Sequence, residues 1–140
     1  MSNVSEMVNK LINSTDKGTL KWRHISNIIK LDEELDKYVT KNKNNILLTS
    51  SEYVVNEKKT FYSEYKDSFF FFFTKIEGGG LFPSGKEFFI IATKIKNGKV
   101  FELNNVKEHQ SDLYRLLNLI ERQTNRVDEL INDFLQDDSV

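Results

Sequence analysis

The chain contains no cysteine, and this absence excludes thiolate catalysis, disulfides and cysteine-bound zinc or iron–sulfur sites. Only four of the 20 basic residues are arginines and the formal net charge is −1, so the basic surplus typical of a nucleic-acid-binding protein is missing. The longest apolar stretch is far shorter than the ~20 residues that span a membrane. We therefore expect neither a nucleic-acid partner nor a membrane partner.

The first residues, MSNVSEMVNK, lack the basic and then apolar pattern of a signal peptide. Together with the absence of cysteine, this predicts a cytoplasmic protein. At 140 residues the chain is expected to form one domain over residues 1–140. A domain of this size buries enough surface to be stable without a disulfide or a structural metal.

The most informative segment is a run of five phenylalanines at residues 69–73. Side chains on a strand alternate between the two faces of a sheet, so this run places phenyl rings on both faces. Burying one such ring stabilises the fold by roughly 1.5–3 kcal/mol, which makes it costly to leave either face in water. We expect helices, a second subunit or a ligand to cover the two faces.

The first third of the chain predicts two helices and a short strand. Apolar residues at helical spacing indicate an amphipathic helix over residues 4–17, with Asn3 as its N-cap and Gly18 just after its end. Alternating apolar and polar residues at 19–26 indicate a short strand. A second, short helix is expected over residues 32–40.

The middle of the chain predicts an antiparallel meander of four to five strands. Residues 60–65 and 69–76 read as a hairpin, and residues 87–95 form a further apolar strand. The Asn97-Gly98 pair is a strong signal for a type I′ turn. This turn leads into a last strand over residues 99–103.

The last third predicts helix, with Ser111 as its N-cap. We favour a break at Thr124 and Asn125, where Asn125 would cap a second helix, over one long helix. The expected buried stripe consists of Leu113, Leu116, Leu117, Ile120, Thr124, Val127, Ile131 and Phe134. The residues that follow, 136–140, are expected to fray.

Both ends of the chain resemble a loose group of small bacterial and phage proteins. The resemblance lies in residues 11–22 (LINSTDKGTLKW) and 112–135 (DLYRLLNLIERQTNRVDELINDFL). Proteins of this group have an N-terminal helix, a Gly-x-x-x-Trp step, a few strands and a closing helical segment. The resemblance implies a small accessory protein of bacteria or mobile elements, and it implies no catalytic residues.

Residues 80–87 (GLFPSGKE) nearly match a nucleotide-binding P-loop. However, Glu87 stands where the Mg²⁺-binding hydroxyl belongs, and Lys86 leads into a strand instead of the helix that would hold a phosphate. The alternative is a flexible hairpin loop, which is either a plain connector or a tip whose apolar residues contact a partner. The candidate partner-binding residues are Gly78, Gly79, Gly80, Leu81 and Phe82, together with Phe70 and Phe72 on the strand.

Three of the four arginines, Arg115, Arg122 and Arg126, lie in the C-terminal helical part. Arginine is well suited to bind anions through two parallel hydrogen bonds, so these residues are candidates to hold a small anionic ligand beside the aromatic sheet. The alternative is an ordinary helix surface on which they pair with nearby acids. His24 and His109 have no partner motif for catalysis and cannot form a standard zinc site alone, so we expect no metal, no cofactor and no catalytic residues.

These observations favour an α+β fold in which the N-terminal helix and the C-terminal helical segment pack on one face of the sheet. Three helical segments are too few to cover both faces of an aromatic sheet, so an apolar face is expected to remain for a protein partner. The favoured function is a non-enzymatic interaction module that forms a homodimer and regulates or inhibits another protein. The alternative is a binding protein that holds or sequesters a nucleotide-like anion.

Overall fold

The structure is a computed structural model that describes residues 3–41, 53–77, 85–104 and 106–140. Its helices are α1 (Asn3–Asp16), α2 (Glu33–Lys41), α3 (Gln110–Thr124) and α4 (Val127–Gln136). Its strands are β1 (Arg23–His24), β2 (Tyr53–Val55), β3 (Phe61–Tyr65), β4 (Ser68–Glu77), β5 (Glu87–Ile95) and β6 (Phe101–Glu102). Short 3-10 turns are η1 (Ile25–Asn27), η2 (Glu57–Lys59) and η3 (Val106–His109).

The six strands form one antiparallel sheet, which confirms the predicted α+β class. The strands follow the order β1-β3-β4-β5-β6, and β2 also pairs with β4. Because β3 pairs with residues 68–72 of β4 and β2 pairs with residues 75–77, these two strands lie end to end along the same edge of β4. The long strands β4 and β5 form the centre of the sheet.

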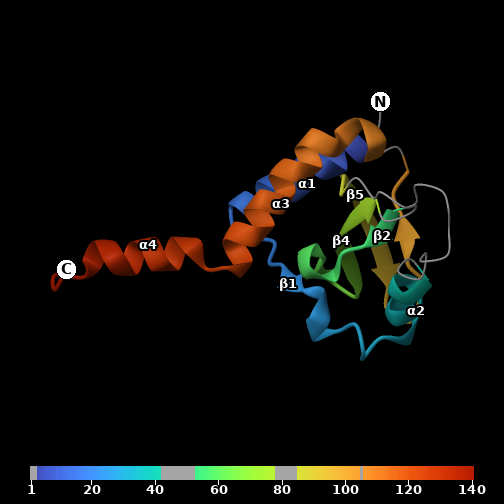
Figure 1. The fold of residues 1–140 in the computed structure, drawn as a ribbon, viewed down its shortest axis with the longest axis horizontal. Helices are drawn as coiled ribbons and strands as arrows, with labels where there is room; N and C mark the ends of the chain where they lie inside the picture. The colour runs from blue at the N-terminus through green and yellow to red at the C-terminus, as the bar shows by residue number, and fades with distance from the viewer. Residues whose placement is uncertain (1–2, 42–52, 78–84, 105) are drawn as a thin grey trace.

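The helices lie on both sides of this sheet (Figure 1). Helices α1 and α3 lie side by side over one face, as predicted for the N-terminal and C-terminal helices, and α2 lies on the opposite side. On the face covered by α1 and α3, the ring of Phe89 contacts two other rings. Its centroid lies 5.7 Å from that of Phe72 and 5.9 Å from that of Tyr114 of α3. On the second face, Phe73 packs against Tyr38 of α2 at 4.9 Å.

The chain's own helices thus cover the centre of the sheet on both faces. Phe71, Phe72 and Phe73 are each 0% exposed. The expectation that an apolar face of the sheet remains open is therefore wrong at the sheet centre. The physical reason is α2, which with η1 supplies Ile25, Leu35 and Val39 as a second buried layer.

The register of β5 decides which of its apolar residues share a face with the phenylalanine run. Ile91 lies opposite Phe72 in the ladder, not opposite Phe71. Directly opposed residues project to the same face, so Phe89 and Ile91 lie on the α3 side with Phe72. An uninterrupted apolar run carries no alternation from which this register could be deduced.

Two turns were predicted between strands, and one has a different form. The β3–β4 hairpin turns at Lys66 and Asp67, with Lys66 at a positive φ of 53°. At the next predicted turn Asn97 has a φ of 65°, but Gly98 does not lie in the left-handed region that a type I′ turn requires at both positions. The strand expected over residues 99–103 is accordingly reduced to β6, and a wider loop precedes it.

The strand expected over residues 19–26 is also much shorter, being only β1. Gln123 of α3 explains the difference, since its side-chain oxygen accepts from the backbone N–H of Trp22 at 2.6 Å and its amide nitrogen donates to the carbonyl of Leu20 at 3.0 Å. The backbone just before β1 is therefore satisfied by a side chain instead of a neighbouring strand. The same contacts fix the C-terminal end of α3 beside Leu20.

The helix ends agree with the sequence in part. Gly18 follows α1 with a φ of 76°, as expected for a C-terminal stop, and α1 begins at Asn3 itself. Helix α3 begins at Gln110, before the Ser111 that was expected to cap it. The predicted break after Thr124 is confirmed, but the residue that precedes α4 is Arg126, not Asn125.

Candidate interaction surface

The junction between α3 and α4 is two residues long and sets the direction of α4. Arg126 has the left-handed conformation (φ 55°, ψ 39°) that non-glycine residues adopt uncommonly. The Arg122 guanidinium donates to Oδ1 of Asp128 from Nη2 at 2.7 Å and from Nε at 3.0 Å. Arg126 pairs with Glu129 in the same way. The hydrogen bonds to these acids raise the pKa of both guanidinium groups, which therefore stay charged.

Helix α4 projects away from the rest of the molecule (Figure 1). Its apolar side chains recur at i, i+3, i+4, i+7 and i+8, which places them on one face of the helix. This α4 apolar stripe consists of Val127, Leu130, Ile131, Phe134 and Leu135. Leu130 is 69% exposed and Phe134 is 54% exposed, and no residue of α4 is buried. An exposed apolar stripe of this kind is typical of surfaces that contact another molecule.

Charge is also distributed unevenly between α4 and the rest of the chain. Residues 127–140 contain five acidic residues and no basic residue. Residues 1–126 contain all 20 basic residues and the other 16 acids, so their formal charge is +4 whereas that of residues 127–140 is −5. A helix that is acidic on one side and apolar on the other fits a site that is apolar at its centre and basic at its rim.

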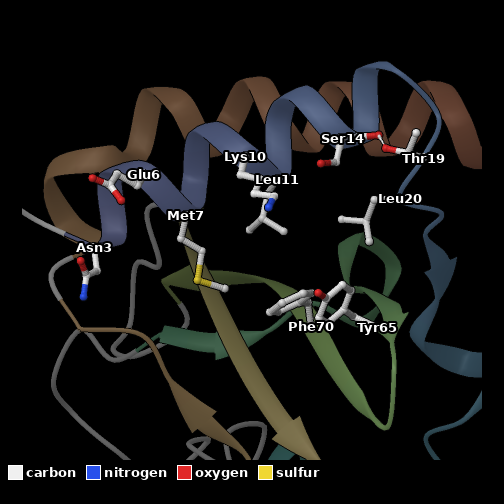
Figure 2. Close-up of a pocket in the computed structure, with 10 residues that line it drawn as sticks. All are labelled: Asn3, Glu6, Met7, Lys10, Leu11, Ser14, Thr19, Leu20, Tyr65 and Phe70. Carbon is white, nitrogen blue, oxygen red and sulfur yellow. Dashed lines mark hydrogen bonds between the residues drawn. The ribbon is translucent and has the colours of Figure 1, made fainter.

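A groove with an apolar interior lies beneath α1. It has a volume of about 600 Å³ and separates α1 and the turn after it from the β3–β4 hairpin. Its walls, which define the α1 groove, are formed by Asn3, Glu6, Met7, Lys10, Leu11, Ser14, Thr19, Leu20, Tyr65 and Phe70. Figure 2 shows Met7, Leu11 and Leu20 pointing toward Phe70 and Tyr65 across the groove. The interior is thus apolar, and the polar side chains lie at its rim.

A second, smaller hollow of about 230 Å³ continues the α1 groove past Thr19 and Leu20. Its walls are formed by these two residues and by Lys21, Arg23, Tyr62 and Glu64. The two hollows together therefore have three basic residues at their edges, Lys10 of α1 among them, and the two acids Glu6 and Glu64. The C-terminal end of α3 lies at the point where they meet, because Gln123 is bonded to Leu20.

The structure places the predicted partner-binding residues in different environments. Phe70 is half-buried and lines the α1 groove. Phe72 is fully buried and offers no surface to a partner of the folded chain. The residues of the glycine-rich loop, Gly78, Gly79, Gly80, Leu81 and Phe82, lie outside the described residues.

The three predicted ligand-binding arginines are also placed apart from the groove. Arg122 and Arg126 contact acids at the α3–α4 junction. Arg115 lies seven residues before Arg122, or about 10 Å along α3. For Arg122 and Arg126 the arrangement corresponds to the alternative in which they pair with nearby acids on a helix surface.

The other candidate motifs have ordinary structural roles where they are described. Lys86 leads into β5, a strand as predicted, and the Glu87 carboxylate lies 3.0 Å from Lys59 Nζ. The ring of His24 lies 2.8 Å from the hydroxyl of Ser26. Within residues 3–41, 53–77, 85–104 and 106–140, no three side chains of histidine, aspartate and glutamate gather as a metal site would require.

The α4 apolar stripe and the α1 groove were not recognised from the sequence. Val127, Ile131 and Phe134 had been placed on a stripe continuous with the buried face of α3. Two signals could have separated them, namely the break after Thr124 and the abrupt change to a segment with acids and no bases. The α1 groove has no local signal, because its walls come from α1, the following turn and a hairpin far along the chain.

The opposite face of the sheet carries a polar cluster under α2. The Tyr38 hydroxyl donates to the carboxylate of Glu102, and Lys75 Nζ lies 3.5 Å from the same carboxylate. Burial, followed by the hydrogen bond to Glu102 and the charge of Glu102, raises the pKa of Tyr38 far above its usual value. This cluster closes the α2 side of the sheet with paired charges.

The raised pKa of Tyr38 predicts a pH dependence of stability. Above about pH 10 a tyrosine in the unfolded chain loses its proton, whereas folded Tyr38 keeps it, so the free energy of unfolding falls as the pH rises. In Tyr38→Phe the free energy of unfolding should fall less steeply between about pH 10 and pH 11. The change in slope should correspond to at most one bound proton. Urea unfolding at several pH values measures the slope, with Tyr65→Phe, at a half-exposed tyrosine, as control. Equal slopes for both variants would contradict the prediction.

Comparisons with protein-family models, with curated proteins and with solved structures find no match for this chain. The resemblance of its two ends to small bacterial and phage proteins therefore stays a prediction. Among the helices that the structure describes, none has both the length and the apolar character needed to cross a membrane.

Proposed function

We propose that this protein is a non-enzymatic interaction module that self-associates and binds a protein partner, with α4 as its docking element. One observation carries the proposal. Helix α4 is ten residues long, has an apolar stripe at regular helical spacing and buries none of its residues against the rest of the chain. Most of the stability of a short amphipathic helix comes from packing its apolar face, so a bare helix of this length is marginal in water. A partner on the stripe would supply that packing.

The biological role that we propose is regulation or inhibition of the bound partner. The resemblance of both chain ends to small bacterial and phage proteins supports an accessory factor of such a system, acting in the cytoplasm. The second expectation, a binder of a nucleotide-like anion, needs the three helix arginines to converge on one site. The contacts of Arg122 with Asp128 and of Arg126 with Glu129 favour the interaction module instead.

A pair of variants that add the same charge to opposite faces of α4 tests the proposal. Ile131→Asp places a carboxylate in the apolar stripe, whereas Asn132→Asp places one on the polar face. We expect Ile131→Asp to weaken association at least tenfold and Asn132→Asp to change it by less than threefold, because only the first desolvates a charge. Sedimentation velocity of fluorescently labelled chain, alone over a concentration series and in a lysate of the source organism, measures both. Equal sedimentation of the wild type and Ile131→Asp in every sample would refute the proposal.

A further inference from the structure

We infer that the α4 apolar stripe of one copy occupies the α1 groove of a second copy, and that the exchange is reciprocal in a two-fold dimer. This inference rests on the proposed function and specifies its self-association. A second copy of the chain is the proposed occupant, because its α4 matches the groove in surface chemistry and in charge and because α4 points away from the groove of its own chain.

The two surfaces match in chemistry. The α4 stripe presents aliphatic side chains and one phenyl ring, and the groove presents aliphatic side chains, a thioether and two aromatic rings. Around these apolar centres the charges are opposite in balance. Residues 127–140 carry five acids, of which Asp128 and Glu129 pair with Arg122 and Arg126, and no base, whereas three bases and two acids border the two hollows. Lys10 and Lys21 would face the acids of α4 from another copy.

The direction of α4 excludes its own groove in the observed arrangement. Helix α4 begins where the α1 groove ends, since Gln123 of α3 is bonded to Leu20 on the groove wall. From that point α4 runs away from the body, on the side opposite to α1 (Figure 1). The Arg122–Asp128 pair joins α3 to α4 across the junction and favours this direction. To cover its own groove, α4 would have to give up this contact.

The same geometry suits a second copy. A half-turn about an axis at the α3–α4 junction exchanges the side on which α4 projects with the side on which the groove lies. Each α4 then runs along the groove of the other copy, and both grooves are filled by one operation. A two-fold arrangement of this kind closes as a dimer and leaves no unfilled groove to propagate a fibre.

The half-turn also predicts the register of the helices. Helix α4 would run antiparallel to α1 of the other copy, from Ser14 near the junction toward Asn3. Phe134 lies seven residues beyond Val127, and Met7 lies seven residues before Ser14, so each is about 10 Å from the junction end. Phe134 is therefore expected near Met7, and the acids of α4 near Lys10 and Lys21.

Zero-length carbodiimide cross-linking of the unaltered chain tests this arrangement. An equal mixture of ¹⁴N-labelled and ¹⁵N-labelled chains is cross-linked, and peptides joining Lys10 or Lys21 to acids of residues 128–138 are identified by mass. We expect about half of these cross-links to join one light and one heavy peptide, as random exchange between copies requires. The pair Lys37–Glu33, 3.3 Å apart within α2, is the internal control and should never be mixed in isotope.

Disulfide formation between introduced cysteines is a second test of the arrangement, since the chain has no cysteine of its own. Chains carrying only Met7→Cys and chains carrying only Phe134→Cys are mixed and mildly oxidised. We expect a disulfide-linked heterodimer at several-fold higher yield than either chain forms with itself. Lys37→Cys, on the opposite side of the sheet, replaces Met7→Cys as the exposed control and should give no excess of heterodimer with Phe134→Cys.

The possible outcomes separate this inference from the proposed function. If Phe134→Cys links mainly to itself, the α4 helices pair with each other, so the groove is not the site although α4 remains the docking element. If Lys10 or Lys21 cross-links only within one isotope, α4 folds back onto its own chain and the dimer is refuted. A monomer at every concentration with neither type of cross-link would overturn the dimer inference, and sedimentation of Ile131→Asp in lysate would then decide the proposed function.

Discussion

Replacing Phe72 with alanine is expected to lower the free energy of unfolding by about 3–5 kcal/mol. Phe72 is 0% exposed and packs against Phe89, which in turn packs against Tyr114 of α3. Truncating its ring removes this burial and leaves a cavity between β4 and the helix layer, which neighbouring backbone cannot close. Urea unfolding followed by circular dichroism measures the loss as a lower midpoint at constant m-value.

Phe70→Ala is the matched control, because Phe70 lies on the same strand and the same face. Its ring is only half-buried and already borders the α1 groove, so its removal enlarges a groove that is open to solvent. The expected cost is about 1–2 kcal/mol, since less apolar area returns to water. Equal losses for the two variants would mean that the groove is closed in solution, and a loss under 1 kcal/mol for Phe72→Ala would contradict the assigned burial.

The contrast between these two rings illustrates what the sequence could predict about the sheet. The turn signals and the phenylalanine run predicted β3, β4 and β5 closely, because each strand is bounded by residues with a local conformational preference. The run also correctly required cover on both faces. Which residues of β5 share a face with Phe71 could not be predicted, since a strand that is apolar on both sides has no alternation and a slip by one residue exchanges the faces.

The cover on the second face was underestimated for a different reason. Residues 32–40 were predicted as a helix, but a short helix with three acids in its first turn gives little indication of what it packs against. Its place under the sheet depends on long-range contacts, such as the ring of Tyr38 on Phe73 and the ion pair of Lys94 with Asp32 at 3.0 Å. In the sequence, a lysine on a strand suggests an exposed position. Only the structure shows that Lys75 and Lys94 are buried beside acidic partners.

The candidate interaction surface was missed for a related reason, although the break after Thr124 and the change to acids without bases signalled its α4 part. Hydrophobic periodicity reports that a helix has an apolar face, but it does not report what covers that face. The apolar stripes of α3 and α4 read as one, and their separation depends on Arg126 adopting a left-handed conformation that its residue type does not favour. The groove has walls from segments at least 45 residues apart, Leu20 and Tyr65 being the nearest pair, so only the tertiary structure brings them together.

Replacing both Leu130 and Phe134 with alanine is expected to weaken self-association by about 100-fold or more. Each side chain would lose roughly 1.5–3 kcal/mol of burial at the interface, and 2.7 kcal/mol corresponds to a hundredfold change in Kd. The free energy of unfolding of the monomer should change by less than about 0.5 kcal/mol, because both side chains are more than half exposed there. Phe72→Ala, by contrast, is expected to lower the free energy of unfolding strongly, although Phe72 and Phe134 undergo the same change from phenylalanine to alanine.

Asn132→Ala provides the control on the polar face of the same helix. Alanine has the highest helix propensity, so neither the double variant nor the control should unfold α4, and their far-ultraviolet circular dichroism should match that of the wild type. Dilution series by sedimentation equilibrium give Kd, and unfolding at concentrations below Kd gives the monomer stability. If the double variant instead loses about 3 kcal/mol of monomer stability at unchanged Kd, α4 packs on its own domain in solution. The stripe would then belong to the core of one molecule, and no second copy would be needed to bury it.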